Sequence, residues 1–242
     1  MTDKPIIFSA PMVRALIDGR KTQTRRALKP QPDTSSDPSG LGRWGTVNRY
    51  GYWRPAAEIR PVQPGDRLWV KEAVTWVSAW GWRYRADNDD LSEKREQGEV
   101  GLWRSPIFMP RRASRLTLPV TDVRVQRVQD ISKVDAVAEG IERLVGSKGP
   151  NHFSRQICGR WSGSFNAPTA QEVYADLWNS LHAKPKPVKG PDGKVSHYVS
   201  YPWESVQETR TFRGLPWIVT GNPWIAAYTF TVRNGNIDGG QV

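Results

Sequence analysis

The sequence has little of what several classes of protein depend on. Of its 242 residues only Cys158 is a cysteine, so an internal disulfide and a zinc site built from thiolates are both excluded. The three histidines, His152, His182 and His197, do not have the spacing of metal ligands. A glycine-rich phosphate loop of the P-loop or dinucleotide type is also missing. The sequence therefore predicts neither a metal nor a cofactor.

Long apolar segments are lacking too. No apolar run approaches the ~20 residues that a membrane-spanning helix needs. The first residues, Met1 to Lys4, lead into a strand-like stretch and contain no apolar signal core. We therefore expect a cytoplasmic protein that has no membrane partner. The oligomeric state is not specified by any pattern in the chain.

Positive charge and tryptophan, in contrast, are abundant. Lysine and arginine number 35 against 24 acidic residues, which gives a net charge of +11. A charge of this size indicates the type of partner rather than the fold, and DNA, RNA and nucleotides are the main candidates. A basic surface that serves only solubility is the alternative. The 12 tryptophans exclude a disordered chain, because side chains of this size are normally buried or stacked.

The pattern of apolar residues predicts short strands interrupted by a few helices, without a repeating βαβ unit. Strands are expected at 6–8, 22–28, 67–72, 115–128 and 224–232, and helices at 9–18, 130–144 and 169–181. Ser132 is the expected N-cap of the second helix, and Gly19 the expected C-terminal cap of the first. This order is typical of an α+β fold with a mainly antiparallel barrel or sheet.

Four stretches carry no helix or strand pattern long enough to belong to this framework. We therefore expect a single domain over residues 1–242 with insertions at 31–60, 78–104, 145–168 and 184–214. Within the last of these, residues 184–200 are rich in lysine, proline and glycine and are predicted to form a basic loop.

The segment most informative about chemistry is Gly19-Arg20-Lys21-Thr22-Gln23-Thr24-Arg25-Arg26, which is dense in cationic and hydrogen-bonding side chains. In a strand, Thr22, Thr24 and Arg26 share one face. Lys21 follows the cap glycine by two residues, so it can lie in the turn and reach toward Thr24. The segment is either the mouth of a polar pocket or a basic strand edge that lies on phosphate.

The pattern Gly19-x-Lys21-x-x-Thr24-x-Arg26 resembles the signature of the ASCH domain, a member of the PUA-like superfamily. In the family this signature is followed by a turn with a barrel strand and then by a strand-to-helix segment. Residues 64–70 resemble the turn and strand, and residues 130–141 resemble the strand-to-helix segment. Residues 222–224 begin the last strand, which completes the pattern. The ordered set is similar to ASCH-like proteins of phages and prophages. The resemblance implies a PUA-like β-barrel with two or three flanking helices and long loop insertions.

ASCH domains as a class are thought to bind RNA through a cleft, and one bacterial branch hydrolyses the amide of N4-acetylcytidine with a lysine, a threonine and a glutamate. These three positions correspond to Lys21, Thr24 and Glu139. Many family members have glutamate at the threonine position, so Thr24 favours the hydrolase branch. The resemblance therefore implies an amidohydrolase that acts on N4-acylated cytosine nucleosides or a related modified nucleobase. The alternative is a non-catalytic nucleic-acid-binding module, for RNA rather than DNA, with a regulatory or phage-related role.

In the hydrolase interpretation each residue has a role that its chemistry allows. Thr24 is the nucleophile, and Lys21 is the base that takes its proton, provided that burial or neighbouring cations lower the pKa of the lysine. Glu139 is the acid–base partner. The expected substrate- or phosphate-binding residues are Arg20, Arg26, Glu72 and Arg111.

More ordinary roles are open for several of these residues. Glu139 lies in a segment with Asp135 and Glu142, which is also typical of a solvated helix face, and Glu72 is also consistent with a salt bridge at a strand end. Tryptophans and arginines alternate in the predicted insertions, which suits either base stacking with phosphate contact or attachment of the insertions to the body. The tryptophans are Trp44, Trp53, Trp80, Trp82 and Trp103, beside Arg43, Arg54, Arg83 and Arg104.

Overall fold

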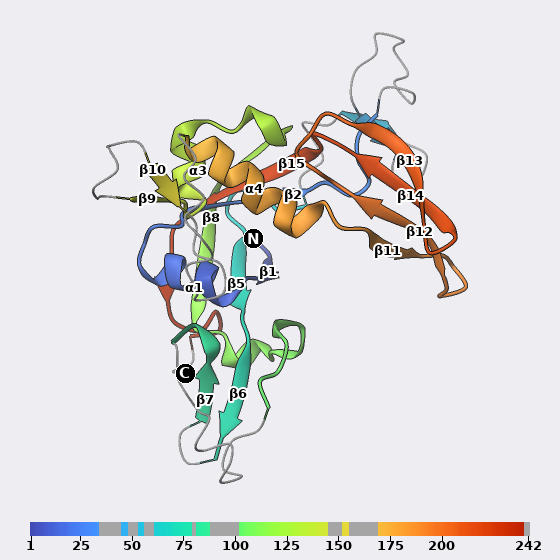
Figure 1. Cartoon of the computed structure of the whole chain (residues 1–242). Coiled ribbons are helices and arrows are strands. Elements are labelled where there is room, and N and C mark those ends of the chain that lie inside the picture. The colour runs from blue at the N-terminus through green and yellow to red at the C-terminus, as the bar shows by residue number, and fades with distance from the viewer. Residues whose placement is uncertain are drawn as a thin grey trace.

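The described part of the chain has an α+β fold with three α-helices and a majority of strands (Figure 1). The computed structural model describes residues 1–33, 45–47, 53–55, 61–78, 81–87, 102–144, 152–154 and 169–239. The predicted fold class is confirmed. None of the helices in these ranges combines the length and apolar character needed to cross a membrane.

A mixed sheet of six strands forms the centre of the molecule. Its order is β1-β5-β8-β15-β2, with β16 beside β8. The strands are β1 (Asp3–Ile7), β2 (Gln23–Ala27), β5 (Arg67–Lys71), β8 (Leu116–Arg127), β15 (Trp224–Phe230) and β16 (Arg233–Asn234). The pair β1 and β5 is parallel, and the other pairs are antiparallel.

The described sheets do not close into a barrel, so the predicted PUA-like barrel is not confirmed. Strands β1 and β2 stand at the two ends of the order, and no ladder joins them among the described residues. The side chain of Arg26 connects them instead. The Arg26 guanidinium in β2 donates a hydrogen bond of 3.0 Å to the Ile7 carbonyl in β1.

The two faces of the sheet pack against different helices because side chains alternate along each strand. Helix α1 (Ala10–Ile17) covers one face, where Val13 and Leu16 join a buried cluster with Phe8 and Tyr228. Helices α3 (Lys133–Ala138) and α4 (Ala170–His182) cover the other, where Ile225 and Ala227 of β15 belong to a second cluster. Strand β15 is therefore buried on both faces.

Helix boundaries follow the expected capping signals. Ser132 Oγ accepts a hydrogen bond from the Asp135 amide at the start of α3, and Thr169 Oγ1 accepts one from the Glu172 amide at the start of α4. Gly19 has φ +71° just after α1, a conformation that glycine adopts at little cost. The predictions for Ser132 and Gly19 are confirmed.

Two predicted segments differ from the structure. The helix expected at 130–144 ends after Ala138, because Gly140 has φ +96°, and the chain continues as β9 (Glu142–Leu144). Residues 184–200 were expected to be a loop, but they form the antiparallel strands β11 (Lys186–Lys189) and β12 (Val195–Ser200). Pro187 is tolerated there because β11 is an edge strand.

Two smaller parts extend from the central sheet in different directions (Figure 1). Beyond the C-terminal end of α4 lies a four-stranded sheet, β11-β12-β14-β13, completed by β13 (Gln207–Phe212) and β14 (Leu215–Thr220). Below the central sheet in this view is the hairpin of β6 (Val74–Val77) and β7 (Gly81–Tyr84).

The remaining elements are short. Strand β3 (Gly45–Val47) pairs with β4 (Trp53–Pro55), and β9 pairs with β10 (His152–Ser154). The 3-10 helices are η2 (Arg85–Asp87), η3 (Pro106–Phe108), η4 (Arg111–Ala113) and η5 (Val128–Asp130).

Candidate functional site

Lys21 and Glu139 form a buried ion pair where the turn after α1 meets the C-terminal end of α3. The Lys21 ammonium lies 2.7 Å from Glu139 Oε2 and also donates to the Glu139 backbone carbonyl at 2.8 Å. Only 1% of Lys21 and 6% of Glu139 is exposed. The backbone holds the two residues together, because they form a β-bridge and the Thr22 amide donates to the Ala138 carbonyl. The predicted Glu139 is therefore not on a solvated helix face.

Arg25 holds the other oxygen of the same carboxylate. Its Nη1 donates to Glu139 Oε1 at 3.1 Å, and its Nη2 lies 3.2 Å from Asp135 Oδ2. Asp135 in turn accepts hydrogen bonds from Gln23 and from Arg124. Glu139 is thus shared between two buried cations, so it keeps a charged partner in Arg25 when Lys21 is neutral.

Burial lowers the pKa of Lys21, because the ammonium loses its hydration. The Glu139 carboxylate opposes this shift, while the charges of Arg26 and Arg25 add to it. The net direction is toward an amine that gives up its proton more readily than an exposed lysine does. This is the property required of a lysine that acts as a base.

Thr24 lies in β2 with 2% of its surface exposed, opposite Tyr228 of β15. Cross-strand partners share a face of a sheet, so Thr24 lies on the face that packs against α1. Lys21 reaches the same side, since its ammonium lies 5.6 Å from the centre of the Phe8 ring. Among the described residues, no hydrogen bond joins the Thr24 hydroxyl to Lys21 or Glu139.

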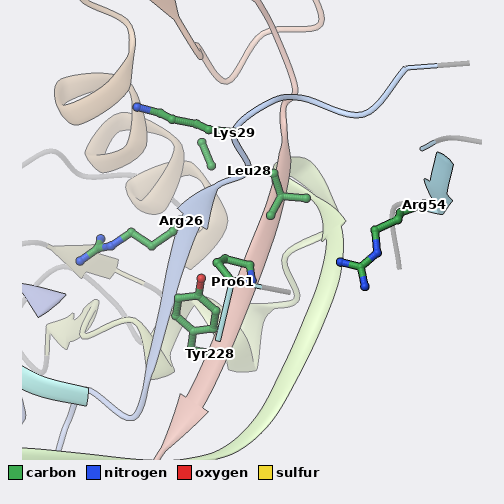
Figure 2. Close-up of a pocket in the computed structure, with 7 residues that line it drawn as sticks. Arg26, Leu28, Lys29, Arg54, Pro61 and Tyr228 are labelled. Carbon is green, nitrogen blue, oxygen red and sulfur yellow. The ribbon is translucent and has the colours of Figure 1, made fainter. Parts of the chain in front are cut away.

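A pocket of about 380 Å³ opens beside this face. Arg26 belongs to both the pocket and the surroundings of the ion pair, because its guanidinium lies 5.3 Å from the centre of the same Phe8 ring. Tyr228, the partner of Thr24, also lines the pocket. Figure 2 shows Arg26 and Arg54 on either side of Pro61 and Tyr228, with the charged end of Arg26 directed away from Arg54. The lining residues are Arg26, Ala27, Leu28, Lys29, Arg54, Pro61 and Tyr228.

The other predicted binding residues lie in separate ion pairs. Arg20 contacts Asp18 and Glu142, both at 2.8 Å. Arg111 contacts Asp3 and Asp238, both at 2.6 Å. Neither residue lines the pocket.

Glu72 is part of a buried network at the start of the β6–β7 hairpin. Its carboxylate accepts two hydrogen bonds from Arg115, at 2.9 and 3.0 Å, and Arg115 also contacts Asp87 and lies over the Tyr84 ring. Burial raises the pKa of Glu72, and Arg115 opposes that shift. This arrangement matches the salt bridge that the sequence left open as the ordinary alternative for Glu72.

The tryptophans of the predicted insertions that the structure describes are mostly packed against the body. Trp82 packs on a cluster with Val74 and Tyr84, and Trp103 packs on Val77. These contacts agree with attachment of the insertions rather than with free stacking surfaces. Trp44, Trp80 and Arg43 lie outside the described residues.

Sequence reasoning missed several residues of the site. Asp135, Lys29, Pro61 and Tyr228 were not predicted as site residues, Arg25 was expected only as a cationic neighbour of Lys21, and Arg54 was noted only as a neighbour of Trp53. Alternation along 22–28 could have separated Arg25 from Thr24 and Arg26, but the strand pairing that brings in Tyr228 has no local signal.

No three histidine, cysteine, aspartate or glutamate side chains of the described ranges cluster in a way suited to a metal ion. Comparison of the chain with protein-family models, curated proteins and solved structures found no match in any of the three.

Proposed function

We propose that the protein is an ASCH-like amidohydrolase that removes an acyl group from N4 of a cytosine nucleoside or a related modified nucleobase. The observation that supports this proposal is the meeting of Lys21 and Glu139, 118 residues apart in the chain, in one buried ion pair. The pocket is lined by Arg26 and by Tyr228, the cross-strand partner of Thr24, whereas Lys21, Thr24 and Glu139 are not among its lining residues.

The proposed reaction needs one nucleophile and one proton carrier. Thr24 Oγ1 attacks the acyl carbon while its proton passes to the neutral Lys21 amine. The bond between the acyl carbon and N4 then breaks, and the proton passes from Lys21 to the departing amine. Water hydrolyses the acyl-threonine ester and releases the carboxylic acid. Glu139 orients Lys21 and stabilises its protonated form.

A direct assay of the wild-type protein tests the proposal. Purified protein is incubated with N4-acetylcytidine and with a panel of other N4-acylated cytosines, and cytidine and free acid are quantified. We expect turnover with at least one member of the panel. Absence of turnover with every member would overturn the hydrolase assignment.

Substitution of the nucleophile gives the sharper test. Thr24→Val retains the shape of a buried side chain and should keep the protein folded, but it should lower turnover by a factor of about 10³ or more. The matched control is Thr117→Val in β8, which is also buried and lies outside the pocket. Equal rates for the wild type and Thr24→Val would eliminate Thr24 as the nucleophile.

A non-catalytic nucleic-acid-binding module is the second candidate. It is favoured by the pocket itself, which has three cationic side chains and no carboxylate among its lining residues. In this case the protein should bind single-stranded RNA with an affinity that falls as salt rises, and it should not turn over the acylated nucleosides. Undetectable binding to both RNA and DNA at low salt would dismiss this candidate.

A further inference from the structure

The side chain of Arg25 is completely enclosed, with 0% of it exposed, and it bridges two carboxylates. Its Nη1 donates to Glu139 Oε1 at 3.1 Å, and its Nη2 lies 3.2 Å from Asp135 Oδ2. Asp135 lies within α3 and Glu139 is its C-cap, so the two side chains are four residues apart on the same side of the helix. Contact with both carboxylates therefore holds the guanidinium in one orientation.

Arg25 points to the other face of the sheet from Thr24, because side chains alternate along β2. Ala27, two residues further along the same face, packs against the cluster that contains α4, and the Arg25 guanidinium lies 5.8 Å from the centre of the Tyr174 ring in α4. Arg25 does not line the pocket. Any effect of Arg25 on the chemistry at Thr24 is therefore transmitted by Glu139.

The charge of Glu139 is divided between two cations, since Lys21 holds Oε2 and Arg25 holds Oε1. Two cations on one buried carboxylate repel each other, and this repulsion is relieved when the Lys21 ammonium gives up its proton. Glu139 raises the pKa of Lys21, whereas the charges of Arg26 and Arg25 lower it. On the side of α4, burial and Glu139 raise the pKa of Tyr174, so this hydroxyl stays neutral.

We propose that Arg25 is a positioning residue for the Lys21–Glu139 pair. By holding Oε1 it directs Oε2 toward Lys21, and by sharing the charge of the carboxylate it allows Lys21 to become a neutral amine. The effect of Arg25 on the protonation of Lys21 follows from the contacts of these three residues alone. Its importance for turnover rests on the proposed function, in which the neutral Lys21 amine takes the proton of Thr24.

Titration of Lys21 by NMR in the full chain, with lysine labelled at its side-chain carbon Cε, tests this inference directly. The Lys21 signal is identified by its loss in Lys21→Met. Arg25→Gln leaves no carboxylate without a cation, because Glu139 keeps Lys21 and Asp135 keeps Arg124, so the variant should fold. It should raise the pH at which Lys21 titrates by about one pH unit or more. Arg20→Gln, the same change of charge one residue from Lys21 but in other ion pairs, should leave this titration in place.

Asp135→Asn should move the titration of Lys21 in the opposite direction. Arg25 then keeps only Glu139 as a charged partner, so its charge acts more strongly on the shared carboxylate and Lys21 titrates at lower pH. A general loosening of the packing would move both variants the same way. If Arg25→Gln does not fold, Asp135→Asn still decides, and Arg25→Lys, which keeps the charge, should titrate close to the wild type. An unchanged or raised titration in Asp135→Asn, or an unchanged one in folded Arg25→Gln, would overturn the proposal.

Kinetics separate this inference from the function on which it partly rests. If the wild type hydrolyses an acylated cytosine, Arg25→Gln should lower kcat about tenfold below the pH at which Lys21 titrates and leave KM unchanged, because Arg25 does not line the pocket. A raised KM with unchanged kcat would overturn the positioning role. Opposite shifts of the Lys21 titration without any hydrolysis would support the action of Arg25 on Lys21 and count against the hydrolase alone. Hydrolysis without these shifts would support the hydrolase and overturn the role of Arg25.

Discussion

At the scale of single residues, the two oxygens of the Glu139 carboxylate are held by two different cations, Lys21 and Arg25. Glu139→Gln removes the carboxylate that pairs with Lys21, while Arg25 retains Asp135. Leaving a buried charge unpaired typically costs about 3–5 kcal/mol. We therefore expect this variant to lose stability of that order in a urea unfolding experiment.

Two comparisons make this prediction specific. Lys21→Met should cost less than Glu139→Gln, because Glu139 is still paired with Arg25. Glu142→Gln removes a partly exposed partner of Arg20 and should cost no more than about 1 kcal/mol. If Glu139→Gln were no more costly than Glu142→Gln, the buried network would not stabilise the fold.

The imidazole of His182 predicts a dependence of stability on pH. It stacks on Trp178 with ring centres 4.0 Å apart, and its pKa falls from the ordinary value of 6.5 to about 3. Between these values the unfolded chain binds a proton that the folded protein does not, so the free energy of unfolding rises with pH in this window. The slope from this residue is at most about 1.4 kcal/mol per pH unit, and the stabilisation is complete above pH 6.5.

Urea unfolding at several pH values between 3 and 7 measures this slope. His182→Phe keeps a ring against Trp178 and should reduce the slope between pH 3 and 6.5. The control is His197→Phe in β12, which leaves His182 in place and should leave its contribution unchanged. An identical slope in the wild type and His182→Phe would show that burial of His182 does not control its protonation.

At the scale of elements, Gly140 decides where α3 ends and how closely α1 approaches it. A Cβ at this position would lie 3.3 Å from the Ala15 Cβ and 3.5 Å from the Lys21 Cβ. Gly140→Ala therefore combines backbone strain at φ +96° with crowding beside Lys21. We expect a loss of stability of about 2–4 kcal/mol and a fall in any activity that depends on Lys21.

Gly193→Ala separates the two effects. Gly193 also has a positive φ, +76°, but an added Cβ there would meet nothing within 4 Å. It should show only the cost of the left-handed conformation, roughly 1–2 kcal/mol. Equal unfolding free energies for the two variants would contradict close packing of Gly140 against α1 and Lys21.

The same elements show how far the sequence could be interpreted. Strands β8 and β15 and helix α4 were predicted close to their observed places, because each has a long apolar pattern and α4 also has a capping threonine. The helix at α3 was predicted too long, since acidic and apolar residues continue past Gly140 and only the positive φ shows the break. The strands β11 and β12 were missed because prolines and lysines hide a short alternating pattern.

At the scale of the whole molecule, the candidate site depends on pairings that have no local signal. Lys21 and Glu139 could be named from a resemblance, and the structure brings them together. The pocket could not be predicted, because Tyr228 and Arg54 line the same pocket as Arg26 only as a result of tertiary packing. The clustering of positive charge is therefore a property of the fold, whereas the net charge of +11 is a property of the composition.

The dependence of nucleic-acid affinity on salt can distinguish these two sources of attraction. For single strands, the logarithm of the binding constant falls with the logarithm of salt concentration with a slope of about −0.7 per phosphate contact. If the three cations of the pocket carry the binding, we expect a slope of about −2 for a 20-nucleotide RNA, measured by fluorescence anisotropy. The double variant Lys29→Gln, Arg54→Gln should bring the slope close to about −0.7. A wild-type slope of about −5 that the double variant leaves unchanged would show instead that the general basic surface binds the strand, because many phosphate contacts would then lie outside the pocket.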